Sequence, residues 1–174
     1  QPGDEVFGDI GFGAFAEYAV ARATSIARKP AAVSFEDAAA TPLAALTALQ
    51  GLRDVGGLRA GQKVLINGAS GGVGTFAVQI AKALGAEVTA VCSTTKLDRA
   101  AAIGADEVID YTEADYTTER GYDLLFDNAG NRPWSETSKV LVPGGINAAI
   151  TGPKHAVMGP FRNLIARKVQ SLAG

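Results

Sequence analysis

The chain has 174 residues, enough for one sizeable domain or for one domain and a piece of another. Hydrophobic residues make up 47% of it and charged residues 20%, with 21 glycines, a mixture typical of compact α/β proteins. The net charge of -2 gives no basic excess, so neither nucleic acid nor an anionic membrane is an expected partner. The single cysteine excludes an internal disulfide framework, and no apolar run is long enough to span a bilayer. We therefore expect a cytoplasmic protein.

Residues 1–30 predict short strands separated by glycines, at Glu5–Phe7, Ala14–Val20 and Ser25–Ala27. They are too few for an independent barrel. Because the chain begins at Gln1 without methionine and runs straight into strand-like sequence, we expect a further segment upstream.

An Ala- and Leu-rich helical stretch follows. Ser34 offers a helix cap, with Glu36 and Asp37 in the first turn, and the stretch continues to about Val55. Pro42 is expected to mark a restart of the helix.

From Gly61 onward, short apolar runs alternate with helical segments. The runs are apolar on both faces, as buried parallel strands require, and comprise residues 64–66, 88–91, 108–109, 124–126 and 146–150. Helices are predicted at 73–84, 96–103 and 133–141, each followed by a glycine or proline stop signal. Right-handed crossovers between five such strands predict an α/β fold, a Rossmann-type doubly wound parallel sheet.

A glycine-rich turn joins the first of these strands to its helix. Small residues let the backbone approach a pyrophosphate closely, and the unpaired amides at the helix N-terminus favour an anion. The predicted cofactor-binding residues of this turn are Gly68, Ala69, Ser70, Gly71, Gly72, Val73 and Gly74. The context of a buried strand, an amphipathic helix and a βαβ repeat favours dinucleotide binding over a merely structural tight turn.

The end of the second strand should meet the 2′ position of the cofactor, where NAD-specific folds place Asp or Glu. Here the sequence after Cys92 is Ser93-Thr94-Thr95-Lys96. Hydroxyls and a cation suit a 2′-phosphate, so Ser93, Thr94 and Lys96 predict NADP(H), and no carboxylate is expected there for a ribose diol. In the alternative interpretation Ser93 and Thr94 cap the next helix and Lys96 is solvated.

Six segments together resemble the medium-chain dehydrogenase/reductase superfamily, and in particular its zinc-independent quinone oxidoreductase branch. They are GDEVFG at 3–8, GAFAEY at 13–18, AAATPLAALTA at 38–48, NGASGGVG at 67–74, AKALGA at 81–86 and GADEVIDY at 104–111. The resemblance implies that residues 1–30 are the C-terminal part of a GroES-like catalytic domain. It also implies that residues 31–174 are a Rossmann dinucleotide-binding domain, and truncation of this domain at the C-terminus of the chain is one expectation.

The resemblance also implies roles for single residues. Lys96 matches a lysine that binds the 2′-phosphate, and Tyr111 matches a tyrosine near the adenosine phosphate. Asn128 and Thr151 lie where the nicotinamide ribose and carboxamide meet the protein, and Thr47 matches a residue near the nicotinamide. For Tyr111 and Asn128, packing or turn formation at a strand end is the alternative.

No metal is expected. A catalytic zinc needs three protein ligands and an open position. Zinc-dependent relatives carry one ligand four residues before the position of Thr47, where this chain has Leu43. Cys92 is interpreted as a packed residue and His155 as a loop residue.

The apolar stripe within residues 161–172 predicts a helix near the C-terminus. Relatives commonly dimerise through the sheet edge, so a homodimer interface is one interpretation of the stripe. A core-facing helix is the interpretation we favour.

The leading functional hypothesis is an NADPH-dependent oxidoreductase that transfers hydride to a quinone or an α,β-unsaturated carbonyl without a metal. No residue of the chain is identified as catalytic. The alternatives are an NAD(P)-dependent alcohol dehydrogenase of the same superfamily, and an NADPH-binding protein with little catalysis.

Overall fold

The computed structural model describes residues 1–150 and 169–171. It divides into two compact units, residues 1–46 and 47–174. The domain boundary expected near residue 30 stays a prediction.

The first unit contains a two-stranded antiparallel sheet of β1 (Val6–Gly8) and β2 (Ile26–Arg28), with the 3-10 helix η1 (Ala23–Ser25) just before β2. Two of the predicted strands thus form, each shifted by one residue. The strand predicted at 14–20 is wrong, because Phe15 and Val20 there are fully solvent-exposed and the stretch consists of bends and irregular backbone. A strand needs a neighbour for its backbone amides and carbonyls, and none of the described strands pairs with this stretch.

Helix α1 (Phe35–Leu49) begins after Ser34, whose Oγ accepts a hydrogen bond from the Asp37 amide at 3.0 Å, so the predicted cap is confirmed. The restart at Pro42 is wrong, because Pro42 lies inside a continuous helix. Proline removes one backbone donor there, and the remaining helical hydrogen bonds carry the chain past it. A π-helical segment, η2 (Gln50–Val55), continues directly from α1.

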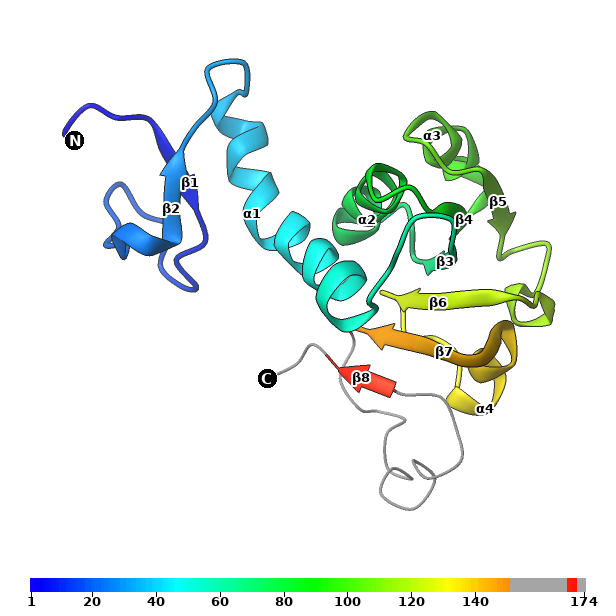
Figure 1. The fold of residues 1–174 in the computed structure, drawn as a ribbon. Coiled ribbons are helices and arrows are strands. Elements are labelled where there is room, and N and C mark those ends of the chain that lie inside the picture. The colour runs from blue at the N-terminus through cyan, green and yellow to red at the C-terminus, as the bar shows by residue number, and fades with distance from the viewer. Residues whose placement is uncertain (151–168, 172–174) are drawn as a thin grey trace. The chain divides into compact units, whose positions relative to one another are not determined.

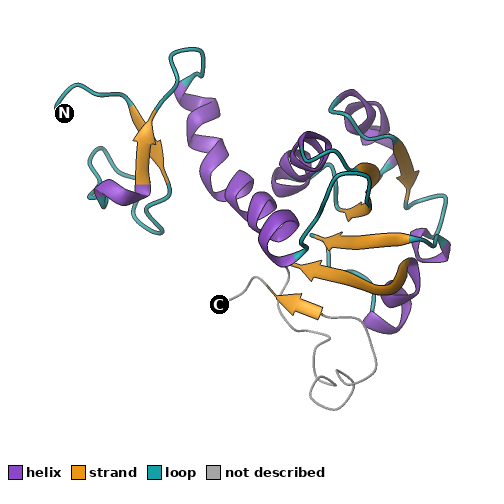
Figure 2. Ribbon diagram, viewed as in Figure 1, coloured by secondary structure: helices purple, strands orange, loops and turns teal. Residues whose placement is uncertain are grey.

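The second unit is built on a parallel sheet. Its strands are β3 (Lys63–Asn67), β4 (Glu87–Cys92), β5 (Glu107–Asp110), β6 (Tyr122–Asp127), β7 (Leu141–Ala149) and β8 (Val169–Ser171). The connections contain α2 (Gly72–Ala83), η3 (Thr94–Lys96), α3 (Leu97–Ala102), η4 (Tyr116–Thr118), α4 (Trp134–Thr137) and η5 (Ser138–Val140). Figure 2 shows these helices, turns and strands alternating along the chain.

The spatial order of the strands is β5-β4-β3-β6-β7-β8, and every neighbouring pair is parallel (Figure 1). The chain winds outward from β3 to β5, then returns to place β6 against the other side of β3. The order therefore reverses between β3 and β6, and ligands of open α/β sheets bind at such a point, beyond the carboxyl ends of the strands. The predicted α/β doubly wound sheet is confirmed.

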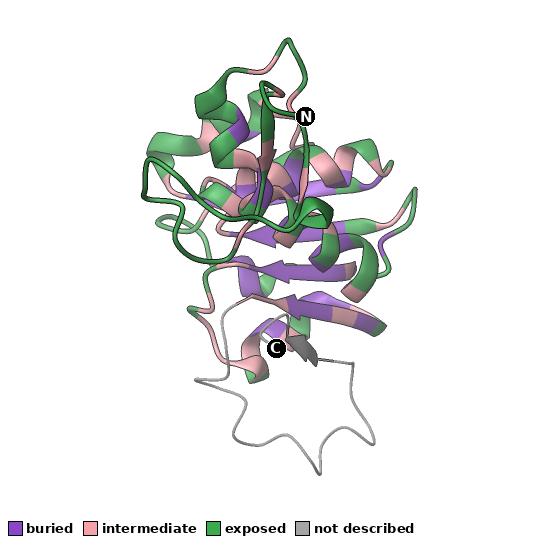
Figure 3. Ribbon diagram, turned by 90° about the vertical axis from the view of Figure 1, so that its left-hand side faces the viewer, coloured by how far each residue is buried: buried purple, intermediate pink, exposed green. Residues whose placement is uncertain are grey.

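Both faces of the sheet are buried, as the apolar runs predict (Figure 3). Val64 and Ile66 pack with Ala77 and Val78 of α2 in one core. Leu65 alternates to the opposite face and packs with Leu125, Tyr116 and Val140 in a second core. The period-2 alternation of a strand thus distributes β3 between the two layers.

The C-terminal part of the sheet departs from the predicted pattern in two places. Pro143 and Gly144 do not separate a helix from a strand, because β7 already begins at Leu141 and contains both residues. The pairing of β7 with β6 has a bulge here, since its register shifts between Tyr122 and Leu124 of β6. A bulge leaves backbone groups outside the ladder, so proline is tolerated, and Gly144 adopts a φ of 84°. Of the helix predicted at 161–172, residues 169–171 form strand β8 instead, because they continue the parallel ladder of β7, and the rest lies outside the described residues.

Leu65→Ala should destabilise the second unit by about 2–5 kcal/mol, because Leu65 is fully buried between two strands and its loss leaves a cavity. Urea unfolding followed by circular dichroism measures this. The control is Gln79→Ala, at an exposed position of α2, which should change the free energy of unfolding by less than about 0.5 kcal/mol. Equal effects of the two substitutions would contradict the placement of Leu65.

Candidate functional site: a dinucleotide pocket

The glycine-rich turn follows β3 directly. Gly68 has a φ of +78°, which places it in the left-handed region that glycine tolerates without strain. Its carbonyl oxygen accepts the Gly71 amide at 3.1 Å, which closes the turn. The amides of Gly68 and Ala69 both donate to the carbonyl of Val91 in β4, at 3.2 and 3.0 Å. The turn is therefore fixed to both β3 and β4.

Helix α2 begins at Gly72 with Gly71 as its N-cap, and no side chain caps it. The amide of Thr75 makes a helical bond to the carbonyl of Gly71 at 2.9 Å. The amides of residues 72–74 precede that bond, and helix geometry gives them no acceptor within the helix. These donors and the positive end of the helix dipole suit a phosphate.

Gly74 is required by packing. A Cβ at this position would collide with the carbonyl oxygen of Gly68 and lie 2.7 Å from the Ala69 backbone. A Cβ at Gly72, by contrast, would meet nothing within 4 Å. Packing of the helix against the turn therefore requires glycine at position 74. At position 72 the surface is open, and packing does not require glycine there.

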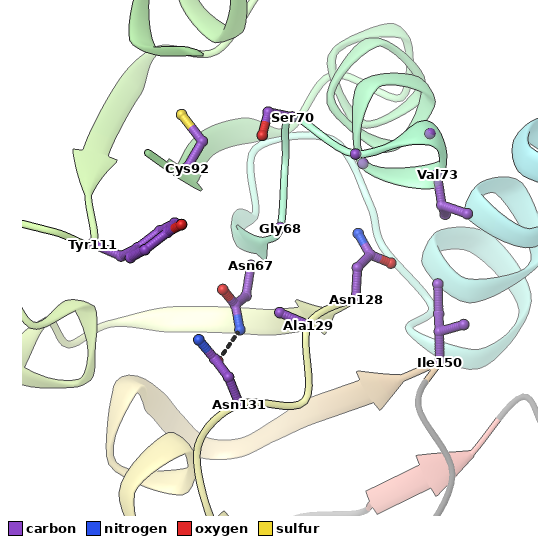
Figure 4. A pocket seen from close by; sticks show the side chains of 13 residues that line it. Asn67, Gly68, Ser70, Val73, Cys92, Tyr111, Asn128, Ala129, Asn131 and Ile150 are labelled. Atoms are coloured by element: carbon purple, nitrogen blue, oxygen red, sulfur yellow. Dashed lines mark hydrogen bonds between the residues drawn. The ribbon is translucent and has the colours of Figure 1, made fainter. Parts of the chain in front are cut away.

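A pocket of about 480 Å³ lies at the carboxyl ends of β3, β4 and β6, where the strand order reverses (Figure 4). Eight of the predicted site residues line it: Gly68, Ser70, the residues 71–74, Tyr111 and Asn128. The ring of Tyr111 points into the pocket from the end of β5, and the amide of Asn128 points toward the glycine-rich turn from the end of β6 (Figure 4).

The other predicted residues do not line this pocket. Ala69 is fully buried beneath the turn, where it belongs to the core. Ser93, Thr94 and Lys96 follow β4 beyond the lining residue Cys92, and Thr47 is half-buried in α1. Thr151 lies outside the described residues.

Five lining residues were missed by the sequence analysis as site residues: Asn67, Cys92, Ala129, Asn131 and Ile150. Asn67 and Cys92 end β3 and β4, Ile150 directly follows β7, and Ala129 and Asn131 lie in the loop after β6. Their position at strand carboxyl ends was the available signal, because all these ends meet at one edge of the sheet.

Asn67 organises a buried polar network under the pocket. The two protons on its Nδ2 are shared among three acceptors, Asp127 Oδ1 at 2.8 Å, Asn131 Oδ1 at 3.0 Å and Tyr116 Oη at 3.1 Å. The same Asp127 oxygen accepts the amides of Ala129 and Gly130 at 3.2 and 2.9 Å. The carboxylate, only 3% exposed, is thereby satisfied and holds the turn after β6.

Burial, and to a lesser degree the charge of Asp127, raises the pKa of the Tyr116 hydroxyl well above its usual value. Tyr116 therefore stays a neutral hydrogen-bonding group throughout the physiological range. It serves the network, in which its hydroxyl donates to Asn131 Oδ1 at 3.3 Å.

Asn128 is the exception among the buried polar groups of the pocket. Neither its Nδ2 nor its Oδ1 has a hydrogen-bond partner, although both atoms are inaccessible to solvent. An unpaired buried amide costs free energy, so a ligand that supplies an acceptor and a donor at this point would be favoured.

A carboxylate does lie beside the end of β4, contrary to expectation. Asp110 ends β5 opposite Cys92, and its Oδ1 accepts the hydroxyl of Thr112 at 2.7 Å and the amide of Thr112 at 2.9 Å. The Thr112 hydroxyl lies 3.0 Å from that of Thr94. The expectation from the sequence considered only residues that follow the second strand, β4. Parallel pairing of β5 with β4 places the Asp110 carboxylate beside the same strand end.

Cys92 is a buried free thiol, and burial, followed by the nearby Asp110 charge, raises its pKa. A protonated thiol is a poor nucleophile, which agrees with a packing role. Within residues 1–150 no group of three or more His, Cys, Asp or Glu side chains could hold a metal. His155 lies outside the described residues. None of the described helices is both long and apolar enough to cross a membrane.

The doubly wound sheet, the switch point and the glycine-rich turn define a dinucleotide-binding domain of the Rossmann type. A family model described as zinc-binding dehydrogenase matches residues 72–174. The chain belongs to this family and, within it, to the quinone oxidoreductase-like branch of the medium-chain dehydrogenase/reductase superfamily.

Relatives and solved structures agree. The mitochondrial NAD(P)H oxidoreductase RTN4IP1 of Mus musculus is 43% identical over 141 residues, which cover 75% of this chain and 36% of the relative. The 2-methylene-furan-3-one reductase of Solanum lycopersicum is 37% identical over 87% of this chain and 42% of its own length. The quinone oxidoreductase of Coxiella burnetii superimposes with a TM-score of 0.87 at 30% identity, over 97% of this chain and 55% of that one. The chain thus spans between about a third and a little over half of these proteins.

Gly74→Ala should destabilise the second unit by about 1–3 kcal/mol, because a backbone must move to admit the Cβ. Gly72→Ala, the matched control in the same turn, should leave stability unchanged or raise it slightly, since alanine favours a helix. Thermal melts of both variants measure the difference. A Gly74→Ala melt equal to that of Gly72→Ala would refute the packing role of Gly74.

Proposed function

We propose that the protein is an NAD(P)H-dependent oxidoreductase whose cofactor binds across the pocket at the carboxyl ends of β3, β4 and β6. The observation that carries the proposal is the free N-terminal turn of α2, which faces this pocket and has the unpaired amide of Asn128 opposite it. The relatives named as NAD(P)H oxidoreductase, quinone oxidoreductase and enoyl reductase support it.

The residues fit such a cofactor. The pyrophosphate would lie on the amides of residues 72–74, which have no acceptor within α2. The ring of Tyr111, half-exposed at the pocket wall, would pack against the adenosine side. Asn128, with Thr47 and Thr151, would serve the nicotinamide side, where the carboxamide offers both an acceptor and a donor.

NADPH is the preferred cofactor in this proposal. Lys96 is exposed just after β4, next to Ser93 and Thr94, and an ammonium there would attract the 2′-phosphate. Ala69 would support the turn from below and would not contact the cofactor itself, because it has no exposed surface.

The substrate would be a quinone or an α,β-unsaturated carbonyl, reduced without a metal. The bound cofactor supplies hydride to an electrophilic carbon, and solvent supplies the proton that completes the reduction. The protein positions the two reactants and excludes water from them. Metal independence is supported by Leu43, which offers no ligand at the position where zinc-dependent relatives carry one.

The remaining expectations belong to the same proposal. Residues 1–30 would complete a GroES-like catalytic domain and the protein would act in the cytoplasm on a small molecule, with a homodimer through the sheet edge as the alternative to a core-facing C-terminal stripe. Relatives named as mitochondrial and chloroplastic make the compartment the least supported of these points.

Lys96→Ala should weaken NADPH binding about tenfold or more and leave NADH binding nearly unchanged, because only NADPH carries the extra phosphate. Calorimetric titration of both cofactors into wild type and variant measures this. The control is Arg59→Ala, which removes an exposed cation before the opposite, amino end of β3. Equal losses for the two cofactors on Lys96→Ala would mean that Lys96 serves the fold or a shared phosphate.

The 174-residue chain alone should bind cofactor weakly and reduce no substrate, because the hydride acceptor must be held within about 3.5 Å of the nicotinamide in a dry cleft. In the proposed division of labour, most of the second wall of that cleft belongs to upstream sequence. NADPH oxidation is followed with a small quinone and with an enone, using this chain and a version extended upstream. Comparable rates from the two proteins would contradict that division.

A further inference from the structure

Three hydrogen-bonding side chains form a row at the ends of β4 and β5: Thr94, Thr112 and Asp110. Thr112 Oγ1 lies 2.7 Å from Asp110 Oδ1 and 3.0 Å from Thr94 Oγ1. The turn itself is tight, since the amides of Thr112 and Ala114 bond to the side chain and the carbonyl of Asp110 at 2.9 Å each. The backbone therefore holds Asp110 and Thr112 together, and the hydroxyl of Thr94 joins them from the end of β4.

The direction of these bonds follows from counting protons. A carboxylate only accepts, so the single hydroxyl proton of Thr112 goes to Asp110. Thr94 also hydrogen-bonds to the Asp110 carboxylate, which only accepts, so the hydroxyl proton of Thr94 is used as well. Hydrogen bonding from Thr94 and Thr112 lowers the pKa of Asp110, so its charge is present at neutral pH.

This row of three hydrogen-bonded side chains lies next to the pocket. Cys92 and Tyr111, which both line the pocket, flank it: Cys92 pairs with Asp110 across the strands, and Tyr111 follows Asp110. The adenosine ribose of a doubly wound fold binds at the end of the second strand, which here is β4. Thr94 therefore presents oxygen lone pairs and a nearby negative charge at the place where a 2′ substituent would lie.

A 2′-phosphate and a 2′-hydroxyl respond oppositely to that arrangement. The phosphate needs donors and is repelled by a carboxylate, whereas the hydroxyl can donate to an accepting oxygen. We propose that Asp110, acting together with Thr112 and Thr94, is a specificity-determining residue. Its negative charge counteracts the attraction between Lys96 and the 2′-phosphate. The affinity ratio of NADPH to NADH is thereby lowered, and NADH is also accepted. The inference rests on the proposed dinucleotide function.

Asp110→Asn tests the proposal, because asparagine keeps the acceptor oxygen and the turn while removing the charge. Calorimetric titration should give roughly three- to tenfold tighter NADPH binding, from the lost repulsion of a screened charge pair, and NADH binding within about twofold of wild type. The matched control is Glu113→Gln, the same charge change at an exposed residue of the same turn, which should leave the ratio of NADPH to NADH affinity unchanged.

Equal changes for both cofactors, or an unchanged NADPH affinity, would overturn the proposal. Loss of NADH binding without a gain for NADPH would also overturn it, and would assign the carboxylate to the ribose diol itself. If neither cofactor binds to wild type, the proposed function fails first, and that outcome is distinct because it precedes any substitution. Asp110→Ser, which also forms such turns, replaces Asp110→Asn if the melting temperature of the latter falls.

Discussion

The close contact between the first turn of α2 and the carbonyl of Gly68 is the constraint on which the site depends. No side chain fits between the helix at position 74 and the turn that leaves β3. Since the Gly68 and Ala69 amides are bonded to Val91 of β4, the turn cannot move away to make room. The N-terminus of α2 is thereby fixed at the mouth of the pocket, with its free amides directed outward.

A second constraint holds the opposite wall of the pocket. Asn67 and Asp127 stand in register at the ends of β3 and β6, and their hydrogen bond joins the two strands at the point where the sheet order reverses. Asp127 uses the same oxygen to hold the turn that carries Asn128. Asn67 and Asp127 are both buried, so breaking their hydrogen bond would leave a buried carboxylate with fewer partners. The rigidity of both walls explains how an unpaired amide at Asn128 is kept in place.

Much of the second unit could be predicted from the sequence, because local signals and tertiary requirements coincide there. Buried strands read as continuous apolar runs, and the turn at 68–74 needs Gly68 for its backbone conformation and Gly74 for packing. The predictions are wrong where strand pairing, rather than local sequence, determines the structure. Residues 14–20 have strand-like composition and no described partner, and Pro143 is accommodated by a bulge that depends on its neighbour β6. Asn131 and Asp110 reach the site region only through the three-dimensional order of the strands.

The central claim is that a dinucleotide binds on the N-terminal turn of α2. The most direct measurement is an amide nuclear magnetic resonance titration of the ¹⁵N-labelled chain with NADPH. Binding at this turn should give the largest shifts at the amides of residues 71–74, accompanied by those of Tyr111 and Asn128, with little change at β1 and β2. Saturable shifts that leave residues 71–74 unmoved, or no shifts at millimolar cofactor, would contradict it.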